Sequence, residues 1–91
     1  MTTLDLDNEI QESILKRLRR IEGQVRGLQK MVEEGRPSED VLTQMNATKK
    51  ALESASVMVL QEFLTLSATD LVQGKKDKPA QIAAMLRKFA G

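Results

Sequence analysis

Residues 55–66 read Ala-Ser-Val-Met-Val-Leu-Gln-Glu-Phe-Leu-Thr-Leu, a stretch that is apolar on nearly every side when it is wound into a helix. A helix that is apolar on all sides belongs in the interior of a protein. The whole chain has 91 residues, too few to surround this segment. The stretch therefore predicts an all-α protein that buries this helix by forming an oligomer, either a dimer or a tetramer.

Two breaks divide the rest of the chain, one at Gly35-Arg36-Pro37 and one from Gly74 to Pro79. Glycine commonly ends a helix, and the residue before a proline is pushed away from helical geometry. We predict helices over about 6–34, 39–73 and 79–90, in one domain that spans residues 1–91. Ser38 is the predicted N-cap of the second helix. Lys75, Lys76 and Lys78 form a small basic loop that is most simply a solvated turn.

The first predicted helix carries a heptad-like apolar seam at steps of three and four residues: Ile10, Ile14, Leu18, Ile21, Val25, Leu28 and Val32. Gly23 and Gly27 lie inside this helix, where each costs about 1 kcal/mol relative to alanine. Such glycines favour close packing of the backbone against a neighbouring element.

The composition excludes several kinds of chemistry. There is no cysteine and no histidine, so disulfides, thiolate metal sites and the easiest general base near pH 7 are all missing. We therefore do not expect an enzyme. No apolar run approaches the roughly 20 residues of a membrane helix, and the acidic N-terminus does not resemble a signal peptide. These features predict a cytoplasmic protein without a membrane partner.

Charge is concentrated in one part of the chain. The formal net charge is +1, yet seven basic residues and only three acidic residues lie between positions 16 and 36. Most of the basic residues fall on the helix side opposite the seam, and Arg17 flanks it. A run of this kind is often only a solvated helix face. Arginine also suits phosphate oxygens because its planar guanidinium presents five donors, so the residues alone leave both interpretations open.

A resemblance favours the second interpretation. The segment Leu15–Glu34 resembles the first helix of the copper-sensitive operon repressors, the CsoR/RcnR/FrmR family, and Asp40–Leu52 resembles the start of the second helix. The pattern Arg-Ile-x-Gly-Gln-x-x-Gly, followed by Asp-Val-Leu-x-Gln, carries this similarity. It implies antiparallel three-helix protomers, two long helices and a short third, that form four-helix-bundle dimers and then a tetramer. It also implies a transcriptional repressor that binds double-stranded operator DNA and releases it when an inducer binds.

The resemblance implies that the basic face contacts DNA. Arg17 and Arg20 are the first positions to which this role is carried over. The remaining predicted DNA-binding residues lie on the same face or on the second helix: Lys16, Arg19, Arg26, Lys30, Lys49 and Lys50.

The sensing site of the family does not carry over. Its ligand positions, normally cysteine and histidine, fall on Ser38, Phe63 and Ser67, and a further N-terminal ligand would fall near Leu6. None of these side chains is a good donor for a soft or borderline metal. We predict no metal and no cofactor, with Phe63 filling the volume of an imidazole. Met31, Met45, Met58 and Met85 are interpreted as core residues rather than Cu(I) ligands.

Two functions remain open from the sequence. The first is a repressor whose signal is an unidentified small molecule or protein effector rather than a metal. The second is a helical interaction protein that oligomerises, alone or with a related chain, and no longer binds DNA by itself.

Overall fold

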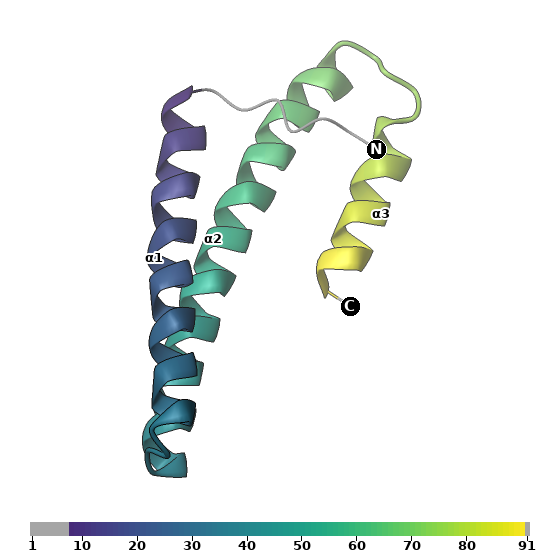
Figure 1. Ribbon diagram of the computed structural model, residues 1–91. Helices are drawn as coiled ribbons and strands as arrows, with labels where there is room; N and C mark the ends of the chain where they lie inside the picture. The colour runs from purple at the N-terminus through teal and green to yellow at the C-terminus, as the bar shows by residue number, and fades with distance from the viewer. Residues whose placement is uncertain (1–7, 91) are drawn as a thin grey trace. The chain divides into compact units, whose positions relative to one another are not determined.

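The computed structural model describes residues 8–90 and contains three helices in that range: α1 (Asn8–Glu33), α2 (Ser38–Val72) and α3 (Lys78–Ala90) (Figure 1). The described residues include no strand, which confirms the all-α prediction. The predicted helix bounds lie within one residue of these, except that the predicted start at residue 6 falls outside the described range. The single domain over residues 1–91 stays a prediction. The chain divides into two compact units, one ending at Val59 and one beginning at Leu60.

In the first unit, α1 and the N-terminal part of α2 lie side by side and run in opposite directions (Figure 1). The reversal depends on Gly35, whose φ is +67°. The Arg36 N–H donates to the Met31 carbonyl at 3.0 Å, and the Gly35 N–H donates to the Val32 carbonyl at 3.1 Å. This is a Schellman turn, which favours glycine because a Cβ is strained at positive φ.

The apolar seam of α1 separates into two rows with different surroundings. Ile14 and Ile21 are buried, and Ala55 of α2 is buried in the same unit. The other row is exposed to between 41% and 61%, namely Leu18, Val25 and Val32. The protomer thus uses one row for its own core and leaves the other on the surface.

The structure of the first unit corrects two predictions made from the sequence, on the glycines of α1 and on the N-cap of α2. No neighbouring atom lies within 4 Å of a Cβ placed on Gly23 or Gly27, so the close packing predicted for these glycines is wrong within the protomer. The predicted N-cap is wrong by one residue. The Val41 N–H donates to the carbonyl of Pro37 at 3.2 Å, so Pro37 precedes the helix and Ser38 is its first residue. Proline suits this position because it has no N–H that needs a partner.

The 35-residue helix α2 contains an 18-residue window with a mean hydropathy of 1.3, of which 11% is buried within the protomer. By length and composition alone, this helix could cross a membrane. A core helix that another subunit covers meets the same criteria. Most of this apolar window is thus not covered by other described residues of the chain.

Candidate nucleic-acid interface and sensing positions

All eight residues predicted to contact DNA lie in the first unit and are exposed. Six are on α1 and two are on α2: Lys16, Arg17, Arg19, Arg20, Arg26, Lys30, Lys49 and Lys50. The six on α1 occur along the side of the helix that carries Gly23 and Gly27, or beside it. We call these eight residues the basic face.

The arginines near this face differ in their partners. Arg26 forms an ion pair with Glu22 one turn earlier, and Arg36 pairs with Asp40 at 3.5 Å. Exposed pairs at this spacing contribute only about 0.3–0.5 kcal/mol to stability, yet each places a negative charge beside its arginine. Arg17 instead donates from Nη1 to the Ser54 hydroxyl oxygen at 3.2 Å, so it keeps its charge uncompensated.

The Arg17–Ser54 hydrogen bond also defines how the two helices are aligned. It joins residues 37 positions apart, from α1 to α2. Lys50 lies one helical turn before Ser54 on α2, on the same side of that helix. The first unit therefore brings Arg17 and Lys50 to a common edge between α1 and α2.

The three positions predicted from the resemblance to correspond to the family's ligands fall in different units. Ser38 is exposed in the first unit and lines an open groove of about 420 Å³ with Val32, Arg36, Val41, Leu42 and Met45. Phe63 and Ser67 lie one turn apart on α2 in the second unit. Leu6 lies outside the described residues. No group of three or more carboxylates, histidines or cysteines within residues 8–90 is arranged to hold a metal ion.

Ser67 is 2% exposed, and its hydroxyl oxygen has no hydrogen-bond partner among residues 8–90. Phe63 is half-buried, and the ammonium nitrogen of Lys78 lies 5.8 Å from the centre of its ring. This distance is within the range of a cation–π contact. A cation of the protein itself therefore lies beside the Phe63 ring.

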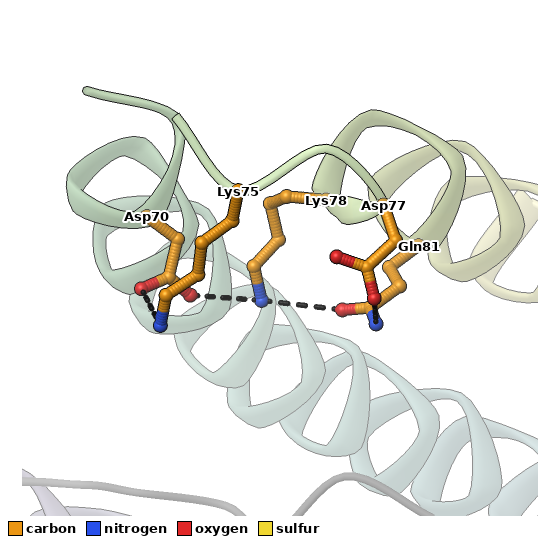
Figure 2. Close-up of polar contacts among 5 residues, drawn as sticks. All are labelled: Asp70, Lys75, Asp77, Lys78 and Gln81. Carbon is orange, nitrogen blue, oxygen red and sulfur yellow. Dashed lines mark hydrogen bonds and ion pairs between the residues drawn. The ribbon is translucent and has the colours of Figure 1, made fainter. Parts of the chain in front are cut away.

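The Lys78 ammonium belongs to a polar cluster between the end of α2 and the start of α3, which we call the Asp70 cluster (Figure 2). The Asp70 carboxylate accepts hydrogen bonds from Lys78 at 3.0 Å and from Lys75 at 3.1 Å. Lys78 also donates to the Gln81 amide oxygen at 3.3 Å, and the Gln81 amide nitrogen donates to Asp77 at 3.1 Å. Asp70 of α2 is thus paired with Lys78 of α3 and with Lys75 in the turn between the two helices.

Local backbone geometry brings these groups together. Gly74 has a φ of +77°, and the Lys75 N–H donates to the Asp70 carbonyl at 3.2 Å, so α2 ends in a second Schellman turn. This turn brings Lys75 and Lys78 close to Asp70. The hydrogen bond from Lys78, followed by that from Lys75, holds the pKa of the Asp70 carboxyl below its ordinary value of 3.8.

The interpretation of residues 75–78 as a solvated turn is wrong for Lys78, because its side chain is 11% exposed and paired. Lys75 is 55% exposed and agrees better with that interpretation. The sequence offers no specific signal for this pairing, since an aspartate followed by lysines at a helix end is common. The contact between Arg17 and Ser54 was not predicted from the sequence either, because it depends on how α1 and α2 align.

The three-helix fold and the exposed basic face fit a helical transcriptional regulator, and comparison with known proteins establishes the class. The metal-sensitive transcriptional repressor family matches residues 10–89, and the chain belongs to it. This family consists of transcriptional repressors, not enzymes.

Three relatives make the similarity concrete. The copper-sensing transcriptional repressor RicR of Mycobacterium tuberculosis is 39% identical over 82 residues, which cover 86% of this chain and 85% of RicR. The copper-sensing transcriptional repressor CsoR of Bacillus subtilis is 32% identical over 80 residues, which cover 86% of this chain and 79% of CsoR. The crystal structure of CsoR with Cu(I) from Geobacillus thermodenitrificans matches with a TM-score of 0.88 at 35% identity, covering 99% of this chain and 96% of that one.

Proposed function

We propose that this chain is an oligomeric repressor that binds double-stranded operator DNA through the basic face and responds to a signal other than a metal. The observation that carries the proposal is the exposed run of Lys and Arg on α1, in which Arg17 pairs with no carboxylate of residues 8–90. Neutralisation of phosphates by such residues supplies much of the affinity of a protein for DNA. A repressor of this kind acts in the cytoplasm, where operator DNA lies.

The uncovered apolar surface supports the oligomer. The exposed row of the α1 seam is matched on the N-terminal part of α2 by further exposed apolar side chains: Leu42, Met45 and Leu52. Exposed apolar side chains gathered on two neighbouring helices are typical of an association surface. Two copies of the α1–α2 pair would cover these rows in a four-helix core, giving a dimer that can assemble further into a tetramer.

The loss of metal sensing is supported by the chemistry at the ligand positions. The serine hydroxyls at Ser38 and Ser67 are poor donors for Cu(I) or Zn²⁺, and Phe63 offers no donor at all. The Lys78 ammonium 5.8 Å from the Phe63 ring is a hydrogen-bond donor without a lone pair, so it adds no metal ligand at these positions. The named relatives sense copper, and this chain has none of the thiolate or imidazole ligands that such sensing requires.

The DNA-binding face is tested by Arg17→Ala and Arg20→Ala. Binding to a duplex from the promoter of its own operon is followed by fluorescence anisotropy over a series of salt concentrations. Each variant should bind more weakly, and each lost phosphate contact should flatten the log–log salt dependence by about one unit. Arg87→Ala on α3 is the matched control and should behave as the wild type. Equal affinity of the wild type and the double variant would refute this face and favour the interaction protein.

The signal is tested by titrating Cu(I), Ni²⁺, Co²⁺ and Zn²⁺ anaerobically into the protein–operator complex. We expect no release of DNA at a stoichiometric metal concentration. Stoichiometric release that is abolished by Ser38→Ala or Ser67→Ala would contradict the proposed loss of the site.

A further inference from the structure

The hydroxyl of Ser54 is used differently from three other hydroxyls of α2. Thr48, Ser56 and Thr65 each donate to the backbone carbonyl four residues earlier, at 3.0, 3.0 and 2.9 Å. This local hydrogen bond is the usual arrangement for Ser and Thr within a helix. The Ser54 oxygen instead accepts a hydrogen bond from Arg17, on another helix.

Ser54 restrains Arg17 without cancelling its charge. A carboxylate partner, such as Glu22 beside Arg26, adds a negative charge that phosphate would have to compete with. A hydroxyl is neutral, and it occupies one of the five N–H donors of the guanidinium. The other donors stay available for a phosphate oxygen, and the arginine side chain has less rotamer freedom to lose when it binds.

We propose that Ser54 is a positioning residue of the DNA-binding face, which holds Arg17 at the edge between α1 and α2 where Lys50 also lies. This inference rests on the proposed function of the basic face. Arg17 and Lys50 then act as a joint phosphate site contributed by both helices of the hairpin. Ser54 does not itself supply charge, so its role is distinguishable from that of the basic residues.

The salt dependence of DNA binding separates positioning from charge. Ser54→Ala should weaken binding about fivefold, roughly the cost of ordering one long side chain on binding, and should leave the log–log salt slope unchanged because no cation is lost. Ser54→Thr keeps the hydroxyl and should restore the wild-type affinity. Ser54→Glu should also hold Arg17, but it pairs its charge, so the slope should flatten by about one unit.

Ser56→Ala is the matched control, since it removes a hydroxyl of the same helix that bonds only to the Leu52 carbonyl. Each variant is measured by anisotropy on the full chain, after sedimentation and thermal unfolding have matched it to the wild type. If Arg17→Ala weakens binding and Ser54→Ala does not, the positioning role is refuted and the DNA face stands. If Arg17→Ala has no effect, the positioning role is refuted; if the double variant with Arg20→Ala has no effect either, the DNA face is refuted as well. A loss with Ser54→Ala that Ser54→Thr does not restore also overturns the positioning role.

Discussion

Replacement of Gly23 and Gly27 by alanine should stabilise the protein. Both glycines lie inside α1, where glycine costs about 1 kcal/mol relative to alanine. A Cβ at either position meets no neighbouring atom within 4 Å, so nothing in the protomer opposes the gain. Each substitution should therefore raise the free energy of unfolding by about 1 kcal/mol, and the pair by about 2 kcal/mol. For a chain of this size, each kcal/mol corresponds to a rise of roughly 4–8 °C in the midpoint.

The same chemical change at Gly35 provides the control, because it should act in the opposite direction. Gly35 has a φ of +67°, where an L side chain costs about 1–2 kcal/mol. Urea and thermal unfolding of the variants are compared at equal protomer concentration, since oligomerisation makes midpoints depend on concentration. If Gly35→Ala lowers the midpoint while Gly23→Ala and Gly27→Ala fail to raise it, the basic face is covered by another subunit in solution, and its exposure is refuted.

Three further predictions concern the second unit and the assembly. Because the native pKa of Asp70 is lowered, its ion pairs add stability above pH 3.8, and this stability is lost as the pH falls through the native pKa. Asp70→Asn should therefore be less stable than the wild type at neutral pH and equally stable in acid. A constant difference in unfolding midpoint over this pH range would contradict the assignment. Ser67→Ala removes a buried hydroxyl without a partner and should stabilise the protein by about 1 kcal/mol in urea unfolding, whereas a loss of stability would reveal an unrecognised partner. Sedimentation at micromolar concentration should detect dimers or tetramers, and a folded monomer would refute the role given to the uncovered apolar rows.

The sequence predicted the helices well because their signals are local. A seam with steps of three and four residues defines one face of α1, and glycines at positive φ end both long helices. The predicted N-cap was wrong by one residue. Whether Pro37 or Ser38 directly precedes the helix depends on backbone angles, which composition does not determine. The open surroundings of Gly23 and Gly27 could not be foreseen either, since packing against a neighbour is a tertiary property.

The candidate ligand positions rest on offsets along the chain and stay predictions. Ser38, Phe63 and Ser67 were located by their distance from the Asp-Val-Leu motif. The contact between Arg17 and Ser54 was not predictable, because residues 37 positions apart meet only through the alignment of two antiparallel helices. Lys78 was missed for a similar reason, since its burial depends on how the chain reverses after Gly74.

The Asp70 cluster bears on why a metal signal is absent from the proposed function. A ligand can shift a protein between states only if it binds one state better than the other. Here the end of α2 and the start of α3 are already joined by the Lys78 ammonium, which is paired with Asp70 at 3.0 Å and is 11% exposed. Because this cation is attached to the chain, its effective concentration beside Asp70 is of the order of millimolar or more. A free metal ion far below that concentration, and without thiolate or imidazole ligands, gains too little to displace it. Under the proposed function, any regulation of DNA binding is therefore expected to act through a part of the protein other than Phe63 and Lys78.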